Sequence, residues 1–90
     1  MLNIVTEFIG TFIFLTVILT TGSPLFIGLA LTSVIAFGGK VSGGHFNPAV
    51  STMLLLKKTI NLETWITYVL AQILGGMLAL FYYNYSVKKK

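Results

Sequence analysis

Most of the groups that could do chemistry lie in one short stretch, Ser42–Val50, which interrupts an otherwise apolar chain. The stretch reads SGGHFNPAV and contains His45 and the pair Asn47-Pro48. An asparagine followed by a proline is typical of a helix start, because Asn caps the first turn and Pro fits the first helical position. Such a start presents unpaired N–H groups and a partial positive charge of about half a unit. Together with the Asn47 amide, this predicts a site that binds a passing oxygen atom and repels cations.

Two further polar side chains, Glu7 and Gln72, stand within long apolar stretches. Ionisable groups in a membrane are expensive to bury and usually mark function. We expect Glu7 to support the loop by accepting hydrogen bonds from its backbone or from His45, and Gln72 to do similar work; a proton relay through Glu7 is the alternative. We expect His45 to be a hydrogen-bonded residue at the mouth of the site.

The residue inventory argues against a metal, a cofactor or an enzyme. The chain has one histidine and no cysteine, so a metal site lacks a second strong ligand. The two acidic residues, Glu7 and Glu63, lie in different stretches, and no glycine-rich phosphate loop follows a strand. We therefore predict no cofactor and no catalytic activity.

Composition places this site in a membrane. Of the 90 residues, 56% are hydrophobic and 9% are charged, against about a quarter charged in an ordinary soluble domain. A spanning helix needs about 20 apolar residues, and we expect three, at about 4–21, 24–41 and 62–85, in one domain over residues 1–90. The net charge of +4 comes from lysines alone, and half of these form the run Lys88–Lys90, so nucleic-acid binding is not predicted. The sequence indicates a multi-pass integral membrane protein whose partner is the lipid bilayer.

Residues 42–56 are too few for another span. A helix over 48–56 would be about 14 Å long, about half of the roughly 30 Å hydrocarbon layer, and Lys57 and Lys58 after it need water. We therefore expect a re-entrant half-helix that begins near the bilayer midplane and returns to the surface from which its loop came, with Gly43 and Gly44 forming the turn. Irregular backbone at that depth is tolerated where it is buried in protein or lines a water-filled cavity. The predicted fold class is all-α, with three transmembrane helices and one re-entrant half-helix.

Small and polar residues recur at helical spacing in each predicted span, and membrane helices approach closely along such faces. We expect these faces to pack against other helices. The three sets are Asn3, Thr6, Glu7, Gly10 and Thr11; Gly28, Thr32, Ala36 and Gly39; and Thr64, Tyr68, Ala71, Gln72, Gly75 and Ala79.

Three parts of the sequence together resemble one known family. The stretch Ser42–Val50 resembles the first Asn-Pro-Ala (NPA) loop of the aquaporin and glycerol-facilitator family, the major intrinsic proteins. Residues 7–11 (EFIGT) and 68–75 (YVLAQILG) resemble its first-helix and third-helix signatures in the same order. The resemblance is to the N-terminal half-repeat alone, whereas family members carry two inverted units whose NPA loops meet at the midplane. It implies a channel for water or small uncharged solutes such as glycerol, with Asn47 lining the pore and Pro48 and Ala49 fixing the loop.

A single half-unit needs a counterpart, and antiparallel pairing of two copies would provide it, since inverted repeats around a midplane site are a general transporter plan. With Lys40, Lys57 and Lys58 on one predicted side of the membrane and Lys88–Lys90 on the other, the positive-inside rule favours neither orientation. We therefore expect dual topology and an antiparallel homodimer, or a higher oligomer of such pairs.

The resemblance also implies which residues would form the constriction. They are Ile27 of one copy with Ile35, Gly44 and Val50 of the other, with His45 near the cytoplasmic mouth. This ring is apolar and lacks the arginine that follows the second NPA loop in the family's water channels. We expect poor discrimination between water and small neutral solutes.

A different function stays open at this point. The chain could be a non-conducting fragment or subunit that needs a full-length relative or a complementary second-half chain. Lys88–Lys90 would then be the start of a missing loop or a cloning remnant.

Overall fold

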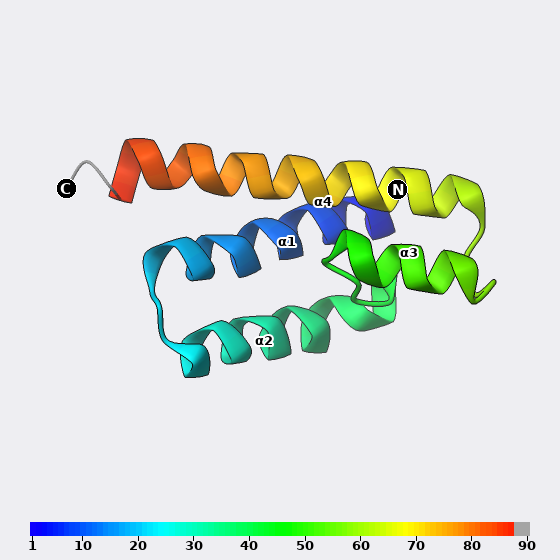
Figure 1. Ribbon diagram of the computed structural model, residues 1–90, viewed down its shortest axis with the longest axis horizontal. Coiled ribbons are helices and arrows are strands. Elements are labelled where there is room, and N and C mark those ends of the chain that lie inside the picture. The colour runs from blue at the N-terminus through cyan, green and yellow to red at the C-terminus, as the bar shows by residue number, and fades with distance from the viewer. Residues whose placement is uncertain (88–90) are drawn as a thin grey trace.

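The computed structural model describes residues 1–87, which form an elongated bundle of helices (Figure 1). Its principal extents are 44 × 23 × 21 Å. Within the described range the helices are α1 (Leu2–Thr20), α2 (Pro24–Ser42), α3 (Pro48–Leu56) and α4 (Leu62–Tyr82), followed by a π-helical turn, η1 (Tyr83–Val87). By length and composition, α1, α2 and α4 could each cross a membrane. The predicted fold class, three spanning helices and one half-length helix, is confirmed.

The helix boundaries follow from local capping. The Ser23 side chain accepts a hydrogen bond from the Phe26 N–H at 3.3 Å, and Pro24 occupies the first turn of α2. The Asn61 side chain caps α4 by accepting from the Thr64 N–H at 2.8 Å. These caps supply acceptors for N–H groups that have no partner inside the helix.

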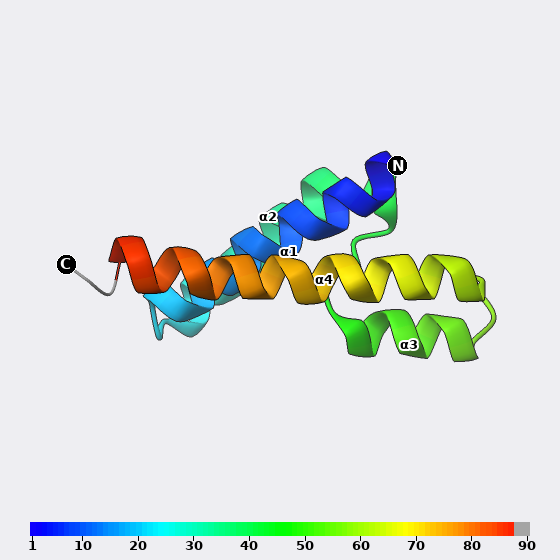
Figure 2. The ribbon, with the colours of Figure 1, turned by 90° about the horizontal axis from the view of Figure 1, so that it is seen from above.

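Helix α1 packs against both other spanning helices, and α3 packs on α4. Figure 2 shows α3 running alongside the N-terminal half of α4. The buried residues of α1 and α4 all belong to the predicted faces: Glu7, Gly10 and Thr11, and Tyr68, Ala71, Gln72, Gly75 and Ala79. The predicted small-residue faces of these two helices are therefore the ones that pack inside the chain.

The face predicted for α2 is not the one that packs within the chain. Gly28, Thr32 and Ala36 are exposed and Gly39 is half-buried, whereas the buried residues of α2 are Ala30, Val34, Gly38 and Ser42. These four recur every fourth residue and so lie on one face. The choice is set by the loop that follows, because Gly38 and Ser42 contact residues of α1 and of the loop.

At Gly75 the backbone of α4 lies close to the backbone of α1. A Cβ atom added there would lie 2.7 Å from the Phe8 carbonyl oxygen and 3.1 Å from the Phe12 nitrogen. Backbone atoms cannot move aside as a flexible side chain does, so we expect Gly75→Ala to destabilise the fold by about 1–3 kcal/mol. Thermal unfolding in detergent, followed by Trp65 fluorescence, measures this. Gly28→Ala is the matched control, since a Cβ there meets nothing within 4 Å; equal melting temperatures for the two variants would contradict the prediction.

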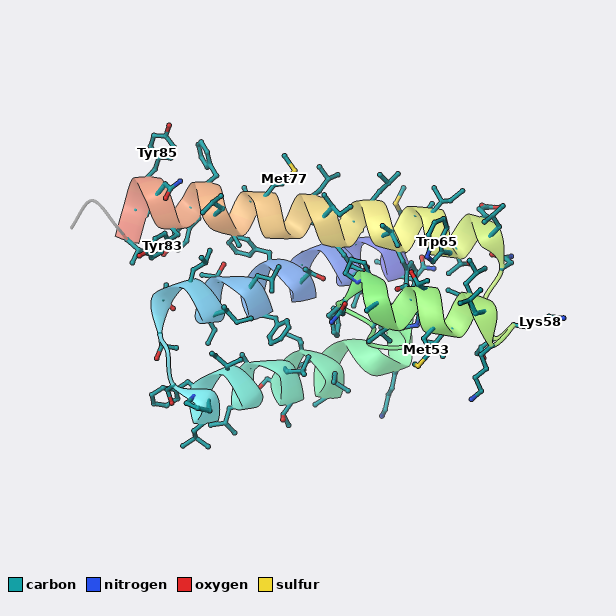
Figure 3. All side chains as sticks on the ribbon, viewed as in Figure 1. Met53, Lys58, Trp65, Met77, Tyr83 and Tyr85 are labelled. Atoms are coloured by element: carbon teal, nitrogen blue, oxygen red, sulfur yellow. The ribbon has the colours of Figure 1, made fainter. Side chains whose placement is uncertain are left out.

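The two ends of the bundle differ in character. Figure 3 shows Lys58 extending from the end at which α3 and α4 are joined, whereas Tyr83 and Tyr85 lie at the opposite end. There the rings of Phe81 and Tyr85 stack with centroids 4.6 Å apart. Lysines and aromatic rings at helix ends are typical of membrane–water interfaces. The predictions that concern Lys88–Lys90 lie outside the described residues.

Candidate functional site

Helix α3 begins as the sequence predicts, with Asn47 as its cap. The Asn47 Oδ1 accepts a hydrogen bond from the Ala49 N–H at 2.8 Å, and the Asn47 carbonyl accepts from the Ser51 N–H at 3.1 Å. Pro48 fills the first helical position. Because Oδ1 makes the capping bond, the two Nδ2 hydrogens remain for another acceptor. Asn47, Pro48 and Ala49 are all exposed, so this helix start is presented at the surface of the single chain.

The start of α3 lies deep along the length of the bundle. Ser51, in its first turn, accepts a hydrogen bond from Gln72 at 2.9 Å, and Gln72 stands near the middle of α4. From there α3 runs to the end of the bundle at which α4 begins (Figure 1). The chain thus enters the bundle from the end of α2, turns, and leaves toward the same end, which is the path of a re-entrant segment.

Glu7 anchors the loop before α3. Its Oε2 accepts from the Ser42 hydroxyl at 2.7 Å and from the His45 N–H at 3.0 Å. Its Oε1 accepts from the Phe46 N–H at 2.7 Å and from the Gln72 amide at 2.9 Å. Four donors occupy the acceptor sites of a side chain that is fully buried. One carboxylate from α1 therefore ties together the end of α2, the loop and the middle of α4.

A second set of hydrogen bonds holds His45. Its Nδ1 lies 2.8 Å from the Ser51 Oγ, which also accepts from Gln72, and the residue is 6% exposed. In the single chain His45 is a buried, hydrogen-bonded residue; its place near the mouth of a pore stays a prediction.

Sequence reasoning gave no site role to two side chains of α4 that complete this arrangement. The Tyr68 hydroxyl donates to the Ser42 carbonyl at 2.6 Å, and its ring packs edge-on against His45 with centroids 4.9 Å apart. The Trp65 indole N–H donates to the Thr52 hydroxyl at 2.9 Å and fastens α3 to α4. The one available signal was Tyr68 in the small and polar face of α4, which predicted packing without naming a partner.

Of the residues predicted to line a constriction, two lie side by side, and Ile27 lies at the far end of α2. A Cβ atom at Gly44 would lie 3.6 Å from Ile35, so these two are neighbours, and Ile35 is 44% exposed. Val50 is half-buried in the first turn of α3, and Ile27 is half-buried in the first turn of α2. Ile27 precedes Ile35 by about 12 Å along the helix axis. The predicted arrangement, in which Ile27 acts with Ile35, Gly44 and Val50 of another copy, stays a prediction, and so does the constriction.

Comparison with known proteins places the chain in a family. Residues 21–89 match the family described as Major intrinsic protein. The chain belongs to the major intrinsic protein family. It is 47% identical over 83 residues to glycerol uptake facilitator protein-like 6 of Lactiplantibacillus plantarum, a match that covers 81% of this chain and 38% of that protein. It is 40% identical over 58 residues to aquaporin Z of Photorhabdus laumondii, covering 64% of this chain and 25% of that protein. It is 43% identical over 56 residues to the lens fiber major intrinsic protein of Gallus gallus, a match that covers 62% of this chain and 21% of that protein.

As a major intrinsic protein, the chain is an integral membrane protein and not an enzyme. It spans less than half of the length of each of these relatives. The resemblance seen in the sequence is confirmed at the level of the family. No solved structure matches the chain.

Proposed function

We propose that this chain forms a channel for passive movement of water and small uncharged solutes such as glycerol, and that two copies pair in antiparallel orientation to complete it. The observation that carries the proposal is the exposed Asn47 amide at the start of a half-length helix deep in the bundle. In an antiparallel pair, two such helix starts would face each other. The names of the relatives, a glycerol uptake facilitator and an aquaporin, support the class of solute.

Selectivity against protons and cations would follow from the polarity of the two facing α3 starts. Each Asn47 offers amide hydrogens, and each start of α3 adds the partial positive charge of a helix N-terminus. A water molecule passing between them turns its oxygen toward the donors and cannot pass a proton along the file. Cations are repelled by the same field, and uncharged solutes are not.

The exposed face of α2 supports pairing. It carries Gly28, Thr32 and Ala36, which are exposed, and a Cβ atom added at Gly28 would meet no atom of the chain within 4 Å. Faces of small residues let membrane helices approach closely. The irregular loop before α3 supports it as well. Such backbone at membrane depth has to be covered by protein or to line a water-filled cavity, and a second copy would supply both.

Vesicles that contain the purified chain alone test conduction. After a rise in external osmolarity, we expect them to shrink faster than protein-free vesicles of the same lipid, because the paired chain provides a path for water. Isosmotic glycerol uptake measured in the same vesicles reports the second solute. No acceleration by the chain alone would contradict the homodimer, and recovery on adding a complementary second-half chain would favour the subunit alternative.

Dual topology is tested separately in cell membranes, because the sequence has no cysteine and single cysteines can be introduced. Gly22 lies in the α1–α2 turn with nothing within 4 Å of an added Cβ, and Lys58 is at the opposite end (Figure 3), next to the exposed Thr59. In antiparallel pairs, an impermeant maleimide added outside should label about half of the Gly22→Cys chains and about half of the Thr59→Cys chains, since neither orientation is favoured and neither substitution removes a lysine. Full labelling of one variant and none of the other would contradict dual topology.

A further inference from the structure

Phe46, the residue before Asn47, has an unusual backbone conformation. Its φ is +54°, in the left-handed region that bulky residues rarely occupy. Such a conformation costs free energy and persists where the surroundings impose it. Because Phe46 is 2% exposed, the imposing contacts lie inside the chain and can be identified.

The ring of Phe46 is held in a notch formed by two glycines, Gly10 of α1 and Gly38 of α2, which we call the glycine notch. A Cβ atom at Gly10 would overlap the ring, at 2.7 Å from Cδ1 and 2.8 Å from Cζ. A Cβ atom at Gly38 would lie 2.9 Å from Cζ. Real Cβ contacts of this length do not occur, so only glycine at both positions leaves room for the ring.

The backbone of Phe46 is fixed at the same time. Its N–H donates to the Glu7 Oε1 at 2.7 Å, so the peptide before the residue is held by α1 while the side chain is held between α1 and α2. With both groups fixed, the residue has no freedom to return to a negative φ. The direction of the following peptide, which carries the exposed Asn47, is then determined by the notch.

We propose that Phe46 is a positioning residue that, seated in the glycine notch, directs the Asn47 amide toward the permeation path. The inference rests on the proposed function of Asn47 and extends it to a specific apolar contact. If the ring leaves the notch, φ relaxes by more than about 100° to the ordinary region, and Asn47 turns with it. An apolar groove of about 340 Å³ beside the ring, lined in part by Ile13 and Phe37, gives the displaced ring a place to go without unfolding the bundle.

A size-compensation experiment tests the contact. The variants are Gly10→Ala, which fills the notch, Phe46→Leu, which leaves it partly empty, and both together. We expect each single variant to lose water flux several-fold per folded molecule and to raise the ratio of proton flux to water flux, because the waters are no longer oriented. The double variant should recover toward the parent chain, since the smaller side chain makes room for the methyl group and the two changes are coupled. Gly22→Ala is the control, because an added Cβ atom there meets nothing within 4 Å and Gly22 lies in the α1–α2 turn, outside the proposed pairing face.

Two measurements, the ratio of proton to water flux and the rate of maleimide labelling, distinguish a positioning role of Phe46 from a packing role and from a chain that does not conduct. A packing role would lower the amount of folded protein and scale water and proton flux together, leaving their ratio unchanged. In Ala49→Cys backgrounds, the rate of labelling by a maleimide reports the presentation of this helix start whether or not the vesicles conduct. We expect the rate to change in both single variants and to return in the double variant. An unchanged labelling rate and an unchanged ratio of proton to water flux would overturn the inference. If the vesicles do not conduct but the labelling rates change as expected, the proposed channel function is wrong and the positioning role of Phe46 stands.

Discussion

Replacing Asn47 with tryptophan should abolish water flux through vesicles that contain the chain. The side chain stands exposed at the start of α3, where a bulky ring would fill the space between two facing helix starts and would remove the amide donors. The expected cost to folding is modest, because losing an N-cap bond costs about 1 kcal/mol. Flux should therefore fall far more than stability does, and osmotic shrinkage alongside thermal unfolding measures both.

Asn61→Trp is the matched control for this variant. Asn61 caps α4 through an Oδ1 bond of 2.8 Å, the same length as the Asn47 cap bond, and it lies at the end of the bundle away from the start of α3. The two substitutions thus remove equivalent caps, and only one of them touches the proposed path. Equal flux in the two variants would place the path elsewhere.

Asn47→Asp tests the role of the amide donors without adding a bulky side chain that would block the path. An aspartate retains the capping oxygen but replaces the amide donors with acceptors and adds a negative charge. We expect the ratio of proton to water flux to rise above that of the parent chain, because the site no longer orients the water oxygen or repels cations.

The parts of the site that could be predicted from the sequence depend on neighbours along the chain. Asn47-Pro48 indicates a helix start by itself, and the short apolar run up to Lys57 limits the length of that helix. Gly43 and Gly44 indicate the turn, and both have positive φ. In each of these cases the interacting groups are a few residues apart, so their types and spacing carry the information.

The parts that could not be predicted depend on which helix faces bring distant residues together. Ser42 meets Glu7 across 35 positions of sequence, and Tyr68 meets Ser42 across 26; no local pattern encodes such a pair. The recurrence of small residues at Gly28, Thr32, Ala36 and Gly39 predicts a packing face of α2. The structure uses Gly38 instead, since the ring of Phe46 needs that glycine, and the periodicity alone cannot distinguish a face that packs within the chain from one left for a partner.

Removing the charge of Glu7 is the second large effect expected. In Glu7→Gln, one of the two carboxylate oxygens becomes an amide that donates hydrogen bonds. It then faces either the Phe46 N–H and the Gln72 amide, or the Ser42 hydroxyl and the His45 N–H. Either way, buried donors lose their acceptor, at about 1–3 kcal/mol for each group left unsatisfied. We expect a clear fall in melting temperature and loss of water flux together, because the loop that presents Asn47 is held by these bonds.

Glu63→Gln serves as the control, since Glu63 is exposed in the first turn of α4 and its charge interacts only weakly with the helix dipole. The same Glu7 variant also decides between the two roles considered for this residue. A proton relay would lose proton flux while the melting temperature and water flux stayed at the level of the parent chain. A loop support loses stability and water flux, and the four donors that converge on one fully buried carboxylate favour that outcome. Because the loop, α2 and α4 already engage its acceptor sites, the carboxylate can accept a hydrogen bond from a passing water only by releasing one of these donors.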